Sequence, residues 1–468
     1  MFPRSTPAAQ GMSSRSIGAL LDWFGERSVE GHSIMVVRHG HVVAEGWWAP
    51  YSAGRPTLLY SATKSFTSIA VGLAVADGLL ALDDRVVDVL PGHVPDDVSA
   101  QGRRITVHHL LSMTSGHGTD SLAEAWEREP GDLVKGFLRV PFTAAEGSLF
   151  AYDNATTFLL ARMVERVTGR DLPDLLDDRL FRPMGIEHAE WDRVASGKAF
   201  GFHGLHLTTE ALAAFGELLL RGGRWGDRQL VPREWVELAT RAHSDIPPFE
   251  DDSARGYGYQ FWRSEHAFYA EGAFGQQCLV IPSLDLVVVV TSHHPRPLTT
   301  ADAVWNHLAP GIGRPDNARD DEILADRLRR LSFPLVTGSG PGLVPGSPTG
   351  AIKATVVAAA DSALPAGSTV LVEPAGDGWR LRLDTIPDLE VGHGRWRESA
   401  PLGRPVVASG AWHGDTFVAD IFVITTPHLV RLVIDGDTAT ATWNVVPLTK
   451  PDLALHLRAP LMTRPDVA

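Results

Sequence analysis

A serine and a lysine three residues apart are the first candidates for chemistry in this chain. The stretch LLYSATKSFTS, residues 58–68, places Ser61 and Lys64 where a short apolar run turns into a predicted helix. The apolar residues after Lys64 recur at helical spacing, and Gly78 lies where such a helix would stop. Ser61 and Lys64 would therefore share a face of the first turn, which is one possible core of an active site.

The chemistry open to this pair is nucleophilic catalysis. A serine hydroxyl is a poor nucleophile without a base, and a lysine can be that base if its surroundings lower its pKa. The start of a helix disfavours a nearby ammonium and offers backbone N–H groups to an oxyanion. The alternative is an N-capping serine beside a solvated lysine, with no chemistry at all.

Two further stretches carry groups that could serve the same reaction. In FAYDNATT, Tyr152 and Asn154 lie two residues apart on a predicted loop. The phenol could pass a proton to a leaving group, and the amide could hold Lys64 or a substrate carbonyl. In YAEGAFGQQCLVIP, a strand ends at Gly272, and small residues there would let a backbone N–H approach a substrate oxygen. A buried tyrosine, a turn asparagine and an ordinary hairpin are the alternatives.

The elements around these motifs indicate one sheet built from both ends of a first domain. Residues 32–48 predict a hairpin with RHGH as its turn, and residues 208–223 predict a helix. The stretches YGYQFWR, AFYAEG, QQCLVIP and DLVVVVTS predict strands, and ADAVWNHLAPGIG predicts a closing helix. Strands at both ends with helices between them are typical of an α+β domain with helices packed on a shared sheet.

The pattern changes after a stretch rich in Gly, Pro and Ser. Beyond it, short β-like runs are joined by Asp-Gly turns, as in STVLVEPAGDGWRLRLD and LVRLVIDGDTATATWNVV. We therefore expect a first domain over residues 1–330, a linker over 331–350 and a small antiparallel barrel or sandwich, lipocalin-like, over 351–468.

Composition excludes several classes of function. The chain has 468 residues, 44% hydrophobic and 21% charged, with a net charge of −14, which disfavours nucleic-acid partners and gives no reason to expect membrane attachment. The N-terminal stretch lacks the apolar region of a secretory signal, and no run of about 18 apolar residues occurs. We expect a cytoplasmic protein and leave its oligomeric state open.

The three motifs, in this order, resemble those of the serine β-lactamase and penicillin-binding-protein superfamily. The resemblance covers about residues 1–312 and is strongest to the class C and esterase branch, with its family-VIII carboxylesterases, D-amino-acid peptidases and nylon-oligomer hydrolases. It is supported by EGWWAPY, LALDDRVVDVLP and ITVHHLLSMTSGHG. It implies an antiparallel sheet flanked by helices, a helical insertion and a cleft between them.

The resemblance also implies roles for individual residues. Ser61 would be the nucleophile, Lys64 its base partner, Tyr152 the proton carrier and Asn154 the substrate amide. The backbone N–H groups of Ser61 and Ala273 would form the oxyanion hole. No cofactor and no metal are implied.

The third family motif departs from its usual form. Relatives place Lys-Thr-Gly, His-x-Gly or Trp-x-Gly where this chain has Ala270-Glu271-Gly272. The position offers no cation for a substrate carboxylate, which counts against an efficient β-lactamase or muropeptide carboxypeptidase. Esters, neutral amides and thioesters stay open. Glu271 alternates to the other face of the strand, and we interpret it as solvated or structural.

Other candidate residues favour a structural interpretation. The pairs His108-His109 and His293-His294 do not form a metal-ligand pattern. Cys278, the only cysteine, lies in an apolar strand and is expected to be an inert core residue. His117 lies on a loop that the resemblance places near the cleft, where it could touch substrate or be incidental.

Three functions follow from these features. The leading one is a serine hydrolase acting on a small-molecule or peptide ester or amide through an acyl-enzyme. The second is a penicillin-binding-protein-type thioesterase that releases or cyclises a peptide, since such enzymes also carry a β-barrel-like domain. The third is a binder of β-lactams or peptides without turnover.

Overall fold

The structure is a computed structural model that describes residues 1–246, 255–294, 300–342, 350–384, 386–459 and 462–463. The chain folds into two compact units. The first contains Met1–Gly46 and Leu58–Arg330, and the second contains Trp47–Thr57 and Leu331–Met462. No helix in the described part of the chain is long and apolar enough to cross a membrane. The predicted linker lies partly outside the described residues, and the predicted cytoplasmic location stays a prediction.

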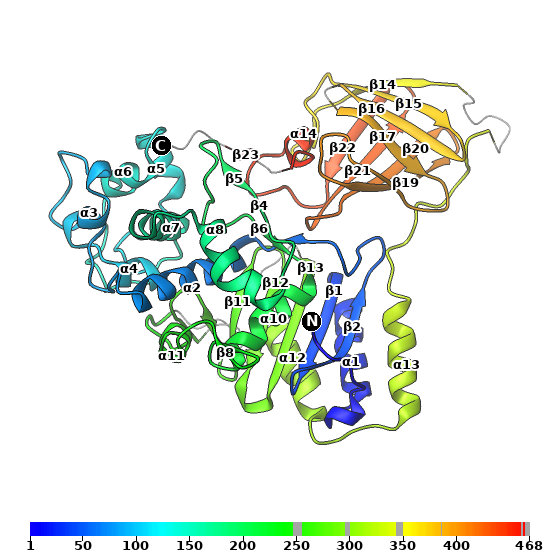
Figure 1. Cartoon of the computed structure of the whole chain (residues 1–468). Helices are drawn as coiled ribbons and strands as arrows, with labels where there is room; N and C mark the ends of the chain where they lie inside the picture. The colour runs from blue at the N-terminus through cyan, green and yellow to red at the C-terminus, as the bar shows by residue number, and fades with distance from the viewer. Residues whose placement is uncertain (247–254, 295–299, 343–349, 385, 460–461, 464–468) are drawn as a thin grey trace. The chain divides into compact units, whose positions relative to one another are not determined.

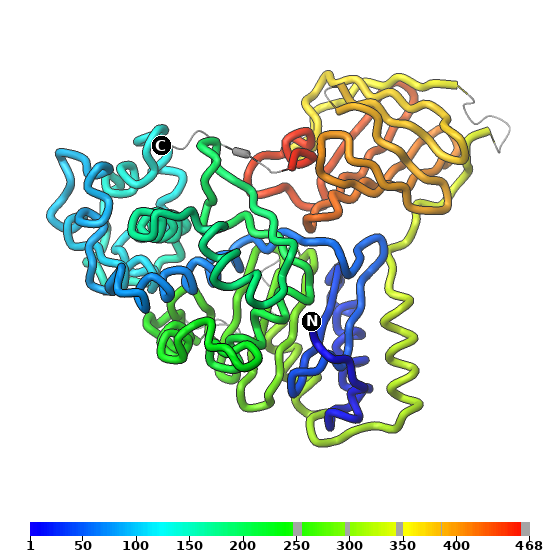
Figure 2. The backbone as a smooth tube through the Cα atoms, viewed as in Figure 1, coloured from blue at the N-terminus to red at the C-terminus, as the bar shows by residue number. Residues whose placement is uncertain are grey.

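The first unit is built on a seven-stranded antiparallel sheet with the strand order β2-β1-β13-β12-β11-β10-β9. Its strands are β1 (Glu30–Arg38), β2 (His41–Trp47), β9 (Gly256–Tyr257), β10 (Trp262–Arg263), β11 (Phe268–Gly272), β12 (Gln276–Ile281) and β13 (Leu286–His293). Ile34 in β1 pairs with Val290 in β13, so strands from the two ends of the unit lie side by side (Figure 2). The predicted sheet is confirmed.

Helices cover both faces of this sheet. Helix α10 (Thr209–Leu220) packs on β1, β12 and β13, where Cys278 Sγ lies 3.5 Å from the carbonyl of Leu212. The next residue, Gln277, points to the opposite face and accepts a hydrogen bond from the backbone N–H of Thr300, the first residue of α12 (Thr300–Leu308). α12 packs with α1 (Ser14–Glu26), which also contacts α13 (Ala318–Arg329).

A helical insertion separates the two halves of the sheet, as the resemblance implies. Its members gather beside β11 rather than beside β1 and β2 (Figure 1). They are α2 (Thr63–Ala76), α3 (Val86–Val89), α4 (Val107–Leu111), α5 (Leu122–Arg128), α6 (Leu133–Arg139), α7 (Asn154–Thr168), α8 (Leu172–Leu176) and α9 (Arg182–Met184). Short strands β3 (Thr57–Leu58), β4 (Glu190–Trp191), β5 (Arg193–Val194) and β6 (Leu205–Leu207), then α11 (Arg233–Thr240), complete the region. The α2 and α7 helices pack against each other.

The second unit is a closed β-barrel. Its main strands are β14 (Ile352–Val356), β15 (Thr369–Ala375), β16 (Gly378–Leu383), β17 (Ile386–Gly392), β18 (Arg397–Ser399), β19 (Val406–His413), β20 (Thr416–Val423), β21 (His428–Asp435) and β22 (Thr438–Trp443), followed by α14 (Leu453–His456). The pairing of β17 with β19 closes the sheet. Buried Trp379, Trp412 and Phe417 help to fill its core, so the barrel interior is packed with side chains.

A short segment from early in the chain belongs to this second unit. The backbone of Ala49 exchanges hydrogen bonds with Leu331 and Phe333, at 3.0 and 2.8 Å. Buried Tyr51 donates to the carbonyl of Thr426 at 3.1 Å. The sequence did not predict that residues 47–57 would fold with the barrel.

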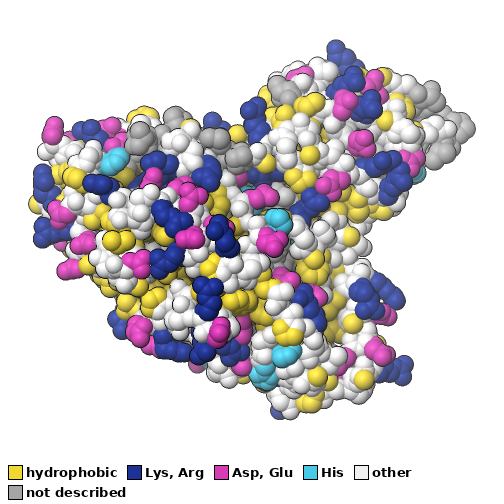
Figure 3. All heavy atoms as spheres, viewed as in Figure 1, with side chains coloured by type: hydrophobic (Ala, Val, Ile, Leu, Met, Phe, Trp, Pro, Cys, Tyr) yellow, Lys and Arg dark blue, Asp and Glu magenta, His cyan; other side chains and the backbone are white. Residues whose placement is uncertain are grey.

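Two other details differ from the predictions. The stretch YGYQFWR is two short strands rather than one, because Gln260 adopts a positive φ of 66° between them. Helix α13 follows the predicted closing helix and was not expected. On the face of the molecule drawn in Figure 3, basic and acidic side chains are interspersed, so the net charge of −14 does not gather into one acidic patch there.

Candidate active site

Ser61 lies in a 3-10 turn, Tyr60–Ala62, that leads directly into α2. The N-cap position of α2 is Ala62, and no side chain caps this helix. The alternative of an N-capping Ser61 is therefore wrong. Tyr60 has a positive φ of 50°, which is uncommon for a residue with a side chain and marks a constrained turn.

Lys64 is buried, with 1% of its surface exposed. Its Nζ atom donates to Asn154 Oδ1 at 2.7 Å, to Ser61 Oγ at 2.9 Å and to the carbonyl of Phe202 at 3.1 Å. The alternative of a solvated lysine is therefore wrong. The three acceptors hold the amine against the Ser61 hydroxyl.

Burial lowers the pKa of Lys64 from 10.5 to about 7, and the carboxylates of Asp120 and Asp153 oppose part of this effect. Burial dominates because an ammonium loses its hydration inside the protein. At neutral pH a substantial fraction of Lys64 is therefore a neutral amine. Such an amine can accept the proton of a hydroxyl 2.9 Å away.

Asn154 is the first residue of α7, and Asp153 caps this helix by accepting from the backbone N–H of Ala155. Asn154 Nδ2 donates to Asp120 Oδ2 at 2.6 Å, and the Asn154 backbone N–H donates to Asp120 Oδ1 at 3.0 Å. Asp120 therefore fixes the orientation of the amide whose oxygen receives Lys64. Burial, followed by the nearby charge of Asp153, raises the pKa of Asp120.

The Tyr152 hydroxyl is hydrogen-bonded to Ser61, and burial raises the pKa of Tyr152 well above its ordinary value. The phenol therefore stays protonated near neutral pH. Its ring stacks on Trp262, with ring centroids 5.5 Å apart, and the Lys64 Nζ atom lies 4.8 Å from the Tyr152 ring centroid. Phe150 also packs against Trp262, so an aromatic wall borders the hydroxyl of Ser61.

The corner between β11 and β12 lies against the turn that carries Ser61. A Cβ atom on Gly272 would stand 1.9 Å from the carbonyl oxygen of Leu59 and 3.1 Å from Tyr60 Cβ. Only glycine fits this approach. The ring of Phe274 also packs edge-on against Tyr60, 5.1 Å between centroids. The structure thus brings Gly272 and Ala273 to the segment that carries Ser61.

Ala270 and Glu271 lie on opposite faces of β11. Ala270 pairs with Cys278 and is buried, whereas Glu271 pairs with Gln277 and accepts a hydrogen bond from Gln277 Nε2 at 2.9 Å. This agrees with the predicted alternation and with a structural role for Glu271. Its charge also reaches the site, since it raises the pKa of Tyr152 in addition to burial.

The remaining predicted candidates lie apart from this chemistry. His117 is buried, stacks on Phe142 with 4.3 Å between centroids and lies 3.2 Å from the carbonyl of Val140. It is a core residue, and its Nδ1 atom lies 3.4 Å from Asp153 Oδ2, so it reaches the site only through that carboxylate. Cys278 is buried, and burial raises its thiol pKa to about 12. Within the described residues, no group of His, Cys, Asp and Glu side chains could hold a metal ion.

Sequence reasoning missed three parts of the site. They are the carboxylate of Asp120, the backbone carbonyl of Phe202 and the wall residue Trp262. Asp120 and Phe202 are about 60 and 140 positions from Lys64, and neither belongs to a motif that identifies it. A carbonyl carries no signal in the sequence, and a lone aspartate or tryptophan fits many roles.

Comparisons with known proteins find similar sequences and a similar fold. The profile of the family described as Beta-lactamase matches residues 14–309. The chain is 32% identical to esterase EstB from Burkholderia gladioli over 209 residues, which cover 38% of this chain and 53% of EstB. It is 26% identical to 6-aminohexanoate-dimer hydrolase from Paenarthrobacter ureafaciens over 301 residues, 60% of this chain and 76% of that one. A solved structure titled "Putative 6-aminohexanoate-dimer hydrolase from Bacillus anthracis" matches the fold with a TM-score of 0.52 and 19% identity, over 70% of this chain and 86% of that one.

Proposed function

The chain belongs to the beta-lactamase family, and from that premise we propose that Ser61 forms an acyl-enzyme with an ester or amide substrate. The chain is a serine hydrolase of this family. The observation that carries the proposal is the hydrogen bond from buried Lys64 to Ser61, combined with the lowered pKa of Lys64. A neutral amine so placed supplies the base that a serine hydroxyl needs.

In the proposed reaction, Lys64 accepts the proton of Ser61 as Oγ attacks the substrate carbonyl. The N–H groups of Ser61 and Ala273 receive the negative charge that develops on the carbonyl oxygen. Tyr152, which stays protonated, delivers a proton to the leaving group, and the Lys64 ammonium replaces it. Water then attacks the acyl-enzyme, with the same groups acting in the reverse sense.

The names of two relatives support ester and amide substrates. One is named an esterase and another is named a 6-aminohexanoate-dimer hydrolase. The buried methyl group of Ala270 provides no cation for a carboxylate, and the aromatic wall of Tyr152 and Trp262 suits an apolar group. We therefore propose neutral esters and amides as substrates.

Acyl transfer to an amine stays a prediction, since it uses the same acyl-enzyme with another acceptor. Binding without turnover also stays a prediction, since a binder that is acylated and then stalls uses the same hydrogen bond between Lys64 and Ser61.

A substrate panel tests the proposal. Purified chain and the Ser61→Ala variant would be given p-nitrophenyl esters of increasing chain length, D-amino amides and nitrocefin. The proposal expects hydrolysis of short neutral esters that Ser61→Ala abolishes. Activity that survives in Ser61→Ala, or preferential turnover of nitrocefin, would contradict it.

A further inference from the structure

A loop that belongs to none of the catalytic motifs covers Lys64. We call residues 197–203, between β5 and β6, the covering loop. The carbonyl of Phe202 accepts a hydrogen bond from Lys64 Nζ at 3.1 Å, and the Phe202 ring centroid lies 5.6 Å from the same atom. This loop therefore contributes both an acceptor and part of the apolar cover that keeps Lys64 out of water.

The covering loop is tied directly to the two helices that carry the site. Thr67, one turn after Lys64 on α2, donates to the carbonyl of Gly201 at 2.7 Å. Arg162, two turns after Asn154 on α7, donates through Nη2 to the carbonyl of Ala199 at 2.9 Å. Gly201 has a positive φ of 76°, and a Cβ there would stand 2.7 Å from Ala161 Cβ. The loop is thus held closely against α7.

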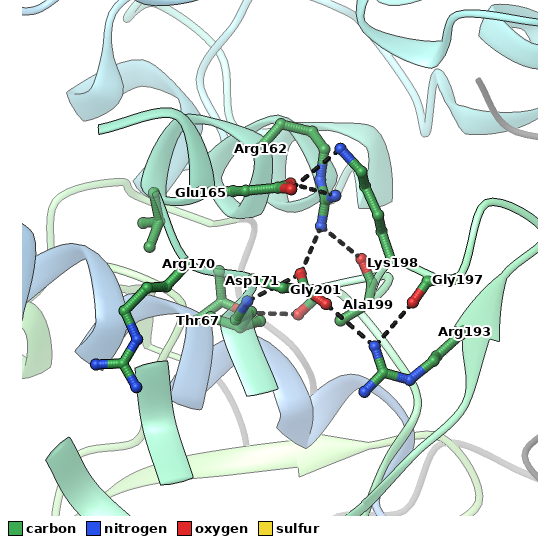
Figure 4. Close-up of polar contacts among 12 residues, drawn as sticks. Thr67, Arg162, Glu165, Arg170, Asp171, Arg193, Gly197, Lys198, Ala199 and Gly201 are labelled. Atoms are coloured by element: carbon green, nitrogen blue, oxygen red, sulfur yellow. Dashed lines mark hydrogen bonds and ion pairs between the residues drawn. The ribbon is translucent and has the colours of Figure 1, made fainter. Parts of the chain in front are cut away.

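Charged side chains behind the loop fix the orientation of Arg162 (Figure 4). Arg162 Nη2 lies 3.3 Å from Asp171 Oδ1, and Asp171 Oδ2 receives Arg193 Nη1 at 3.1 Å. Arg193 Nη1 also donates to the carbonyl of Gly197 at 2.8 Å. We call Arg162, Asp171 and Arg193 the clamp. Together they hold the first half of the covering loop from two points.

A second ion pair supports Arg162 from α7 itself. Glu165 Oε2 accepts from Arg162 Nη1 at 2.6 Å, and Glu165 Oε1 lies 3.0 Å from Lys198 Nζ. The Arg162 side chain is 9% exposed, so its charge requires these partners. Removing one partner of a buried charge pair costs far more than breaking a surface ion pair. The ion pairs of Arg162 therefore hold the covering loop firmly against α7.

We propose that the clamp and Thr67 are positioning elements that hold the Phe202 carbonyl and ring against Lys64 and so set the basicity of the catalytic amine. The proposal rests on the proposed function of Lys64. It assigns a role to residues that touch neither the substrate nor Ser61.

The direction of the expected effect follows from burial. Desolvation is the largest cause of the lowered pKa of Lys64. Loosening the covering loop admits water and returns the pKa toward 10.5, and this outweighs the loss of one carbonyl acceptor. The titratable groups facing Lys64 are Asp120, Asp153 and Tyr152, and the variants below alter none of them.

The experiment compares three variants with wild type. Thr67→Val removes the hydroxyl and keeps the side-chain shape, and Arg162→Met removes the clamp's link to Ala199. Arg170→Met is the matched control, because Arg170 comes just after α7 but pairs with Asp178 at 3.0 Å and points away from the covering loop (Figure 4). Each variant is measured for kcat and KM on p-nitrophenyl acetate from pH 5 to 10, with thermal unfolding in parallel.

We expect Thr67→Val and Arg162→Met to lower kcat at pH 7 by up to about tenfold, the upper end of what one lost neutral hydrogen bond allows. KM should change little, and the acidic limb of the pH profile should move to higher pH. Arg170→Met should leave both kcat and the limb unchanged. A purely structural role would lower the melting temperature without moving the limb.

Two results would overturn the proposal. One is an unchanged acidic limb in Thr67→Val, which decides the matter even if Arg162→Met does not fold. The other is an equal shift in Arg170→Met. Labelling with a fluorophosphonate separates this failure from that of the proposed function. If wild type is not labelled at Ser61, the proposed function is wrong. If wild type is labelled but the acidic limbs of wild type and Thr67→Val coincide, only the positioning role is wrong.

Discussion

The Nζ atom of Lys64 lies 2.7 Å from Asn154 Oδ1, closer than the 2.9 Å that separates it from Ser61 Oγ. Both polar atoms of the Asn154 amide have partners, since Oδ1 accepts from Lys64 and Nδ2 donates to Asp120. In this arrangement Asn154 orients the lysine. The role of substrate amide that the resemblance implies for Asn154 would require the amide to exchange partners when a substrate enters.

Asp120→Asn should move the acidic limb of kcat/KM to lower pH. The Asp120 charge raises the pKa of Lys64 against the larger effect of burial, so removing the charge lowers that pKa further. An asparagine keeps one acceptor oxygen for Asn154 Nδ2, whereas the backbone N–H of Asn154 loses the second oxygen as its acceptor. The measurement is the pH profile on p-nitrophenyl acetate, with Asp178→Asn on the surface as control. A limb that moves upward, or moves equally in the control, would show that Asp120 does not act through its charge.

Lys64→Met and Tyr152→Phe should separate the two proton-transfer roles. Base catalysis typically contributes roughly 10²–10⁴-fold, so Lys64→Met should lower the rate of acylation by about that factor. Tyr152→Phe should slow the release of a poor leaving group, such as an amine, more than that of p-nitrophenol, which needs little protonation. Pre-steady-state kinetics with an anilide and a p-nitrophenyl ester checks this. Equal losses for both leaving groups would remove Tyr152 from the role of acid.

Lys64→Met should also stabilise the fold, and more at neutral than at alkaline pH. The pKa of Lys64 is about 7 in the folded state and near 10.5 when unfolded. Between these two pH values the unfolded chain binds more protons than the folded chain, so the free energy of unfolding of wild type rises with pH. The cost of burying the Lys64 ammonium is therefore largest below pH 7. Offsetting this gain, the carbonyls of Asn154 and Phe202 lose a donor. The free energy of urea unfolding, measured at pH 7 and pH 10, should show the variant's advantage shrink.

Lys135→Met on α6 is the control for that comparison, because Lys135 is only half-buried. Its effect on unfolding should be similar at the two pH values. If the advantage of Lys64→Met is the same at pH 7 and pH 10, Lys64 does not carry the buried charge that the account assigns to it.

Glu271→Gln should improve turnover of anionic substrates. Ala270 is buried, so lysine at that position would be forced into a packed interior, and Glu271 offers a cleaner test. Glutamine can still accept from Gln277 Nε2 while the negative charge near Tyr152 is removed. A partly exposed charge interaction is worth up to about 1 kcal/mol, so kcat/KM for nitrocefin should rise up to about fivefold. For p-nitrophenyl acetate, kcat/KM of the variant should stay close to that of wild type. A rise for both substrates would contradict the electrostatic argument.

Much of this arrangement could be predicted because it rests on local pattern. The spacing of Ser61 and Lys64 and the apolar periodicity after them identified the helix, and alternating strands identified the sheet and the barrel. The hairpin between β15 and β16 was also predicted, although its two turn residues are Gly376 and Asp377 rather than an Asp-Gly pair.

The remainder depends on contacts between distant segments. The backbone carbonyl of Phe202 accepts from Lys64, and a backbone carbonyl cannot be recognised from the residue type. Residues 47–57 join the barrel through buried Tyr51, which donates to the carbonyl of Thr426. Two strands replaced one at YGYQFWR because Gln260 turns the chain while its amide is buried against Leu110 and Leu111. Such tertiary contacts override local propensity.

The most direct test of the account is to trap the acyl-enzyme. Wild-type chain would be mixed with p-nitrophenyl acetate, quenched in acid within the first turnover and digested for mass spectrometry. The account predicts one acetyl group per chain, on the peptide that contains Ser61, together with a burst of p-nitrophenol of matching amplitude, both absent in Ser61→Ala. An acetyl group on another residue, or steady turnover in Ser61→Ala, would contradict the assignment of Ser61 as the nucleophile.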